Sequence, residues 1–385
     1  MNIGFIGLGK LGKPCAEVMA QHYPVYGYDI RTVRAEGVTL CEDIREIPDH
    51  ASLIFIAVQT PHHKEYGGES PTSTLEARNF DYTDLKTCLS SIASYLTPQH
   101  TIVIISTVLP GTIRKELAPL LPAGTLVYNP YLIAMGTVKE DMTNPEMIII
   151  GTKRGNDPAV SLLKELYNKI SAHPCRYETG TWEEAEAIKI FYNTFISAKI
   201  GIVNMIQDVA EKNGHINVDI VTGALARSNK RITSAAYMKA GMGDGGPCHP
   251  RDNIALSWLA GSLDLGYDLF KSIIESREKQ AFNMAQKLVS YHQPVVILGS
   301  SYKPEVTLTD GSYALLVAHY VQLAGTEIFL DTTPDQRSFT YLLGHDKDYD
   351  DQLFNPGSVV VDPWRKFSSG RNDLMIIHYG NTRQE

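Results

Sequence analysis

The chain has 385 residues and a formal net charge of −8 at pH 7, with 43% hydrophobic and 20% charged residues, which predicts two or three domains of a globular protein. This composition argues against a disordered or fibrous class, and the acidic balance argues against nucleic acid as a partner. No run of about 18 apolar residues and no signal-peptide pattern occurs, so we expect a cytoplasmic protein without a membrane partner.

The first 150 residues contain six short apolar runs rich in β-branched residues, separated by stretches compatible with helices. The runs lie at 2–6, 25–28, 53–58, 102–105, 126–128 and 147–150. Their alternation is typical of a doubly wound parallel sheet, so we predict an α/β domain over residues 1–180. The polar segment 62–79 contains Gly-Gly and Ser-Pro and predicts a long loop over a site.

A long helix is predicted after this domain. Thr181 and Glu184 form a capping-box pattern, and the helical stretch behind them runs to about residue 212. Residues 216–290 keep helical patterns around a glycine-rich segment at 241–246, and strand patterns return at 295–298, 327–330, 358–361 and 374–377. We therefore predict a helical middle domain over 181–289 and a smaller α/β domain over 290–385.

A glycine motif follows the first predicted strand. Gly7, Gly9 and Gly12 have the GxGxxG spacing, and Asp29 ends the second predicted strand. In this setting the motif predicts a dinucleotide site, because the glycines permit a tight turn, approach of a pyrophosphate and close helix packing. Asp29 can accept hydrogen bonds from a ribose diol and would repel a 2′-phosphate, so NAD is preferred over NADP, although Arg31 weakens this preference.

Five cysteines, Cys15, Cys41, Cys88, Cys175 and Cys248, are scattered without zinc-like spacing, so we expect reduced thiols and no metal site. Cys248 stands out because glycines precede it and Pro250 suits the first turn of a helix. A helix N-terminus favours the thiolate, which makes Cys248 a candidate nucleophile with Asp252 about one turn away. The alternative is a buried core cysteine.

Lys189 and Asn193 share one face of the long predicted helix, since four residues separate them. A cation and an amide that converge on one point could stabilise an oxyanion. Alone, this spacing is typical of a solvated helix face. It gains weight beside a dinucleotide site and a nucleophile.

These motifs together resemble the UDP-glucose/GDP-mannose dehydrogenase family. The matching segments run in order along the chain: 7–12, 58–61, 106–111, 129–130, 144–145, Lys189 with Asn193, 245–248 with Asp252, and 298–304. The resemblance implies an N-terminal Rossmann domain, a helical middle that forms a homodimer, and a C-terminal α/β domain that helps to bind a nucleotide-sugar substrate.

The resemblance also implies oxidation of the C6 alcohol through two hydride transfers to NAD, with UDP-glucose as the first choice of substrate and UDP-glucuronate as the product. Cys248 would hold the sugar as a thiohemiacetal and then as a thioester. Lys189 and Asn193 would stabilise the oxyanion, while Thr107 and Asp252 would handle water.

The family pattern assigns binding residues by position. The expected cofactor contacts are Gly7, Gly9, Lys10, Leu11, Gly12, Asp29, Arg31, Val58, Thr60, Pro61 and Thr107. The expected substrate contacts are Tyr131, Leu132, Lys189, Asn193, Arg231, Gly245 and Lys303. Among them, Arg231 resembles the arginine that reaches the nucleotide of the neighbouring subunit.

The sequence departs from the family at two places. Tyr131 and Met135 stand where the family has two glutamates. Tyrosine titrates near 10 and methionine cannot act as a base, so hydrolysis of the thioester is the step in question. Asp310 lies where an arginine is expected after Lys303, which predicts altered recognition of the sugar diphosphate.

Two alternatives therefore stand beside full oxidation. One is a dehydrogenase of a different nucleotide sugar or nucleoside, such as a UDP-N-acetylhexosamine, with an altered or incomplete second oxidation. The other is a non-catalytic nucleotide-sugar-binding protein. The missing glutamates motivate both, whereas the retained Cys248, Lys189 and Asn193 favour an enzyme.

Overall fold

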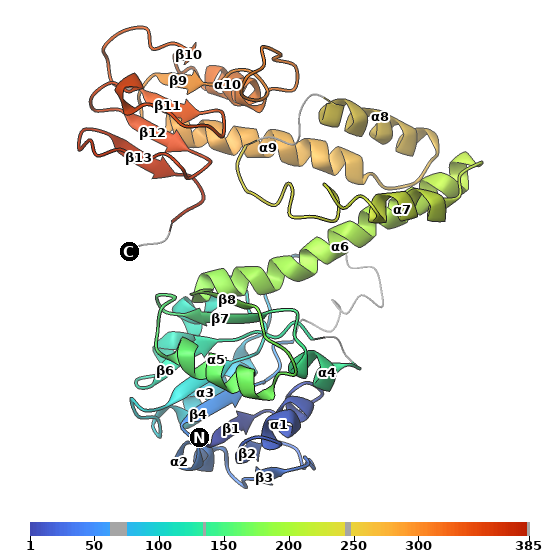
Figure 1. The fold of residues 1–385 in the computed structure, drawn as a ribbon, viewed down its shortest axis with the longest axis vertical. Coiled ribbons are helices and arrows are strands. Elements are labelled where there is room, and N and C mark those ends of the chain that lie inside the picture. Colours follow the sequence, from blue (N-terminus) through green and yellow to red (C-terminus); the bar gives the residue numbers. More distant parts are fainter. Residues whose placement is uncertain (62–74, 134–135, 243–247, 383–385) are drawn as a thin grey trace. The chain divides into compact units, whose positions relative to one another are not determined.

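The computed structural model describes residues 1–61, 75–133, 136–242 and 248–382 (Figure 1). The chain divides into two compact units, Met1–Ala198 and Lys199–Glu385, and the division falls inside one helix. The division into three domains that the sequence predicts stays a prediction.

The first unit contains an eight-stranded sheet with the order β3-β2-β1-β4-β5-β6-β7-β8. Its strands are β1 (Ile3–Ile6), β2 (Val25–Tyr28), β3 (Val38–Leu40), β4 (Leu53–Ile56), β5 (Thr101–Ile104), β6 (Thr125–Tyr128), β7 (Ile148–Thr152) and β8 (Tyr177–Thr181). Because this order contains the dinucleotide-binding arrangement of strands, the predicted Rossmann sheet is confirmed.

One pairing departs from the predicted parallel sheet. β7 runs antiparallel to β6, with Tyr128 opposite Gly151, whereas the other neighbouring strands of this sheet are parallel. The prediction was wrong for this strand, because an apolar run indicates a strand but carries no information about its direction. Mixed sheets of this kind are common in large α/β proteins.

Helices cover both faces of the first sheet (Figure 1). On one face, α1 (Gly12–Ala20), α4 (Val138–Thr143) and α5 (Ala159–Ile170) pack around a core that includes Phe5 and Phe55. On the other face lie α2 (Ile47–His50), α3 (Thr83–Ala93) and the start of α6 (Trp182–Asn213), together with the short helical turns Ile44–Glu46, Ile113–Leu117 and Ala118–Leu120. Burial on both faces explains why the central strands are apolar throughout.

The long helix α6 begins at the predicted capping box. The Thr181 hydroxyl accepts a hydrogen bond from the Glu184 amide at 3.3 Å, and the Glu184 carboxylate accepts one from the Thr181 amide at 2.8 Å. These two bonds satisfy amides that have no partner inside the helix. The predicted start and extent of α6 are therefore confirmed.

The second unit contains α7 (Val218–Ala226), α8 (Cys248–Ser262), α9 (Leu269–Val289), α10 (Tyr313–Leu323) and the short turn Asp351–Leu353. Its strands are β9 (Val295–Leu298), β10 (Ile328–Leu330), β11 (Thr340–Leu343), β12 (Val359–Asp362) and β13 (Met375–His378), all paired in parallel in the order β10-β9-β11-β12-β13. The smaller α/β fold predicted near the C-terminus is confirmed.

Among the described residues, no helix has the length and apolarity that a membrane span requires.

The two sheets share one local hydrogen-bonding feature. Asp29 follows β2, and its carboxylate accepts a hydrogen bond from the Leu8 amide behind β1 at 2.8 Å. In the second unit, Asp331 follows β10 and accepts a hydrogen bond from the Gly299 amide behind β9 at 2.6 Å. In both units an acid at the end of one strand therefore fixes the turn that leaves its neighbour.

Three strands escaped the sequence pattern. β3, β8 and β11 were not predicted. β3 is only three residues long, and β8 contains polar residues and a glycine, so neither shows the apolar run that indicates a strand. The predicted loop at 62–79 lies mostly outside the described residues.

Candidate active site

The glycine motif forms a tight turn between β1 and α1. Gly7 has φ +92°, and a Cβ there would lie 2.7 Å from the Ala57 carbonyl oxygen. A Cβ on Gly12 would collide with the Gly7 carbonyl oxygen. Only glycine fits these two positions, the first for backbone conformation and space and the second for space alone.

Gly9 differs from its two neighbours in the motif. A Cβ at Gly9 would meet only the Arg31 guanidinium, at 3.7 Å, so the fold itself does not require glycine there. The open space beside this backbone fits a pyrophosphate at the start of α1, which is the role expected for the second glycine of a dinucleotide motif. Lys10 and Leu11 complete the turn, with Lys10 exposed and Leu11 half-buried.

Asp29 lies beside this turn with a nearly buried carboxylate. One oxygen accepts the Leu8 amide, and the other accepts the Arg31 amide at 2.9 Å. The Arg31 guanidinium approaches the same oxygen at 3.5 Å. The side chain is therefore held at the end of β2, where a carboxylate can accept further hydrogen bonds from a ribose diol.

The loops after β4 and β5 are tied together at the carboxyl edge of the sheet. The Thr60 hydroxyl donates to the Thr107 carbonyl oxygen at 2.7 Å, and the Ser106 hydroxyl donates to the Val58 carbonyl oxygen. Pro61 is also held, because its carbonyl accepts the Asp81 amide at 2.9 Å. Four residues expected at the cofactor thus lie on neighbouring loops at one edge, as the strand order requires: Val58, Thr60, Pro61 and Thr107.

A buried acid, Glu186 on α6, joins the same edge. Its carboxylate accepts the amides of Gly111 at 2.5 Å and Ile113 at 2.7 Å, at the start of the turn Ile113–Leu117. Burial raises the pKa of Glu186 to about 7, although these two amide bonds oppose the shift. Sequence reasoning missed this residue, because only the fold brings residues 111 and 186 together.

Lys189 lies one turn further along α6 and is half-buried. Its ammonium donates to the Tyr131 carbonyl oxygen at 2.8 Å, and burial lowers its pKa below the usual 10.5. Asn193 follows on the next turn and is exposed. The helix therefore carries Lys189 to the loop behind β6, beside the segment where the sequence lacks its expected acid.

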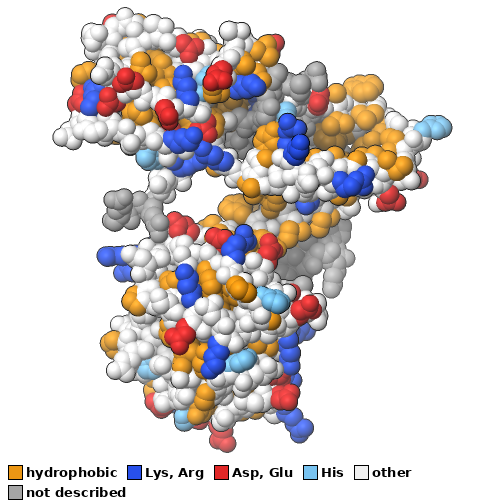
Figure 2. Space-filling model, in the orientation of Figure 1, with side chains coloured by type: hydrophobic (Ala, Val, Ile, Leu, Met, Phe, Trp, Pro, Cys, Tyr) orange, Lys and Arg blue, Asp and Glu red, His pale blue; other side chains and the backbone are white. Residues whose placement is uncertain are grey.

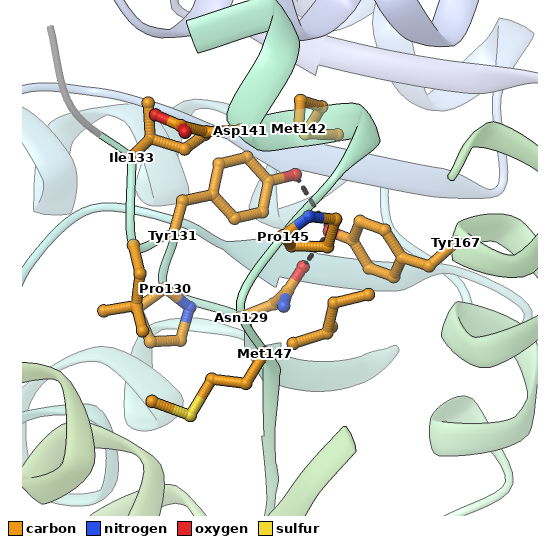
Figure 3. A pocket seen from close by; sticks show the side chains of 11 residues that line it. Asn129, Pro130, Tyr131, Ile133, Asp141, Met142, Pro145, Met147 and Tyr167 are labelled. Carbon is orange, nitrogen blue, oxygen red and sulfur yellow. Dashed lines mark hydrogen bonds between the residues drawn. The ribbon is translucent and has the colours of Figure 1, made fainter. Parts of the chain in front are cut away.

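The phenol of Tyr131 belongs to a buried chain of hydrogen bonds (Figure 3). The hydroxyl oxygens of Tyr131 and Tyr167 lie 2.9 Å apart, and the Tyr167 hydroxyl donates to the Asn129 side-chain oxygen. Tyr131 therefore donates to Tyr167, because the single proton of Tyr167 is already engaged. Burial raises the pKa of Tyr131 well above 10.

These residues line a small cavity of about 20 Å³, close to the volume that holds one water molecule. Leu132 also lines the cavity and packs against the core. The hydroxyl end of Tyr131 thus points into the protein, although the residue as a whole is half-buried, and its backbone carbonyl accepts a hydrogen bond from Lys189. Contact of Tyr131 and Leu132 with substrate stays a prediction.

In the second unit, Cys248 is the first residue of α8, and Asp252 lies about one turn along the same helix and is exposed. The predicted place of Cys248 at a helix start is confirmed. Lys303 follows β9 with its ammonium 5.3 Å from the Tyr302 ring centre, and Arg231 is exposed behind α7. Gly245 and Met135 lie outside the described residues.

The segment that leads toward Cys248 is anchored to strand ends of the second sheet. Lys239 forms an ion pair with Asp346 at 2.8 Å, and the Arg365 guanidinium donates to the Ala240 carbonyl oxygen at 2.5 Å. Gly241 packs against the Trp364 ring, since a Cβ there would collide with it. Lys189 and Cys248 belong to different units, so their convergence on one substrate stays a prediction.

Two models of one protein family match the chain. The NAD binding domain of the UDP-glucose/GDP-mannose dehydrogenase family matches residues 30–171, and the central domain of that family matches residues 183–279. Together they span more than half of the chain.

Some relatives of the chain are named GDP-mannose 6-dehydrogenase and others UDP-glucose 6-dehydrogenase. A GDP-mannose 6-dehydrogenase of Pseudomonas putida is 28% identical over 91% of this chain and 84% of its own length. A UDP-glucose 6-dehydrogenase of Rickettsia prowazekii is 25% identical over 79% of this chain and 74% of its own. The solved GDP-mannose dehydrogenase of Pseudomonas aeruginosa has a TM-score of 0.80 at 22% identity, covering 98% of this chain and 99% of that one, which shows a shared fold.

The glycine motif generates a testable contrast. We expect Gly12→Ala to lower the free energy of unfolding by about 1–3 kcal/mol, because its Cβ would collide with backbone. Gly9→Ala should unfold like the native chain but bind NAD about tenfold more weakly, or roughly 1.4 kcal/mol. Urea denaturation and calorimetric NAD titration measure the two effects.

The control is Gly261→Ala on α8, where a Cβ meets no atom within 4 Å. We expect it to leave NAD affinity unchanged and not to lower the free energy of unfolding, because alanine is the better helix former by about 0.5–1 kcal/mol. Undiminished NAD affinity in Gly9→Ala would contradict the assignment of the pyrophosphate to this turn.

Proposed function

Because the chain belongs to the UDP-glucose/GDP-mannose dehydrogenase family, we propose that it oxidises the C6 alcohol of a nucleotide sugar to the acid, with Cys248 as covalent catalyst. It is an NAD-dependent oxidoreductase that acts on a CH–OH group. The observation that carries the covalent step is the place of Cys248 at the first residue of α8.

The residues of the first unit fit NAD. The open backbone at Gly9 and the carboxylate of Asp29 suit a pyrophosphate and a ribose diol. NAD bound there would supply the hydride acceptor, with two equivalents used per sugar. The loops that carry Thr60 and Thr107 lie at the same sheet edge and would hold the nicotinamide end.

Cys248 would act between the two hydride transfers. The helix N-terminus favours its thiolate, which attacks the C6 aldehyde and forms a sulfur–carbon bond. The former carbonyl oxygen becomes an oxyanion, and Lys189 and Asn193 stabilise it. Loss of the second hydride yields a thioester, from which water releases the acid and returns the thiolate.

Tyr131 would not serve as the base for this hydrolysis. Its phenol donates into the buried chain to Tyr167 and Asn129, and its pKa lies well above 10. A group in that state does not accept a proton from water near neutral pH. We therefore assign activation of water to Asp252 and Thr107, in place of the glutamates that the family uses.

UDP-glucose is the substrate we propose first, and GDP-mannose is the second candidate because a relative that covers most of this chain carries that name. Lys303 supplies a cation for the diphosphate, whereas Asp310 nearby supplies an opposing charge. Arg231 would reach the nucleotide of a second copy, and Gly245 would contact the sugar beside Cys248.

We further infer that the chain works as a homodimer. Large apolar side chains remain exposed along the middle helices, and Figure 2 shows orange hydrophobic atoms gathered there. In the first unit they include Phe191, Phe195 and Ile196 on α6, and in the second unit they include Ile200, Ile220, Ile254 and Trp258. Phe191 and Phe195 alone are 64% and 60% exposed, which is unfavourable for a face that meets only water.

The number of NADH formed per sugar shows whether oxidation stops at the aldehyde or continues to the acid. With UDP-glucose or GDP-mannose and excess NAD, we expect two NADH per sugar and a mass spectrum of the acid. One NADH with an aldehyde product would show arrest after the first step. No NADH with any member of a nucleotide-sugar panel would overturn the proposal.

The lowered pKa of Lys189 predicts how turnover depends on pH. Its charged form stabilises the oxyanion, so turnover should fall as pH rises through its pKa, which burial lowers below 10.5. Lys189→Ala should reduce kcat about 10²–10³-fold, by analogy with loss of one oxyanion donor. The control is Lys199→Arg, an exposed cation on α6, which should keep the native pH profile.

The mass of the protein in solution tests the proposed homodimer. The native chain should sediment with about twice its mass of 42.6 kDa, and Phe195→Asp should move it toward the single-chain mass. Leu323→Asp is the matched control, because Leu323 is a 70% exposed apolar residue that belongs to α10 and not to α6. Equal behaviour of the two variants would rule out the proposed face.

A further inference from the structure

A second cluster of reactive side chains lies at the edge of the first sheet, apart from the residues assigned to catalysis. Cys41 follows edge strand β3, and Glu46 and His50 lie four residues apart on the helical stretch 44–50. One sulfur, one carboxylate oxygen and one imidazole nitrogen of these residues all lie within 4.8 Å of one another. Residues four apart on a helix share a face, so Glu46 and His50 both turn toward Cys41.

The backbone and the imidazole of this cluster are held in place. The Cys41 amide donates to the Gly27 carbonyl oxygen at 2.9 Å, and the Asp43 amide donates to the Glu46 carboxylate at 2.9 Å. The His50 ring stacks on Tyr26 with its centre 4.6 Å away and an angle of 9° between the planes. The three ligand groups are therefore supported by neighbours that are not ligands themselves, as in protein metal sites.

The cluster holds one carboxylate, that of Glu46, and neither a lysine nor an arginine. Arg45, the nearest basic residue in sequence, pairs with Asp43. Across the described parts of the chain, Glu46 forms no ion pair.

We propose that Cys41, Glu46 and His50 bind a divalent cation of the zinc class. Sulfur, imidazole and carboxylate are the ligands that zinc prefers, and water would fill the fourth position on the exposed side. Ligand atoms around tetrahedral zinc lie about 3.3–3.8 Å apart, so the side chains need to close by roughly 1 Å. Binding displaces the Cys41 proton and forms the sulfur–metal bond.

The bound ion joins the end of β3 to α2. β3 is a three-residue edge strand with exposed side chains, paired only with β2 in the sheet order. Such an edge is the weakest part of a sheet. The ion therefore stabilises the NAD-binding unit and takes no part in sugar oxidation, so the inference does not depend on the proposed function.

Cobalt(II) is the probe for the site, because its thiolate complexes absorb strongly in the near ultraviolet. The full chain carries a Cys248→Ser substitution in every sample, so that the catalytic thiol does not contribute. We expect one equivalent of cobalt(II) to produce a sulfur-to-metal band that zinc(II) abolishes. Zinc(II) should also raise the melting temperature.

Cys41→Ser should remove the band and the thermal shift, and His50→Gln should weaken metal binding at least tenfold. The matched control is Cys175→Ser, a half-buried thiol elsewhere in the same unit, which should keep both signals. A band that survives in Cys41→Ser, or no band at stoichiometric cobalt(II) in the starting chain, would overturn the proposed site.

Discussion

A buried carboxylate, that of Glu186 on α6, ties the long helix to the loops of the first sheet. It accepts the amides of Gly111 and Ile113, which otherwise would lie buried at the start of a helical turn without a partner. One turn later, Lys189 donates to the Tyr131 carbonyl oxygen. The loops behind β5 and β6 are thereby held against one face of α6. Thr107 lies on the loop behind β5, and Lys189 lies on α6.

Tyr131 stands where the family resemblance leads us to expect a glutamate, and the fold accommodates its phenol. The phenol takes a place in the interior and completes the chain of hydroxyls that ends at Asn129 and the Ile149 carbonyl oxygen. A buried carboxylate there would need a cation or several donors. The phenol thus has its hydrogen bond satisfied in the core, and in the proposed mechanism other groups take the proton from water.

The sequence predicted the features that depend on local pattern. The strands β1 and β4, the glycine turn and the capping box of α6 each follow from neighbours in the chain. The direction of β7, the polar strand β8 and the contacts of Glu186 depend on partners far away in sequence, so no local pattern reveals them. The place of Cys248 was predictable because Pro250 suits the first turn of a helix.

The covalent role of Cys248 is the central claim, and one measurement tests it most directly. The native chain is mixed with its nucleotide sugar and excess NAD, quenched in acid during turnover, and digested for peptide mass spectrometry. We expect the peptide that contains Cys248 to gain the mass of the oxidised sugar as a thioester. An unmodified Cys248 peptide, recovered while two NADH per sugar accumulate, would contradict covalent catalysis.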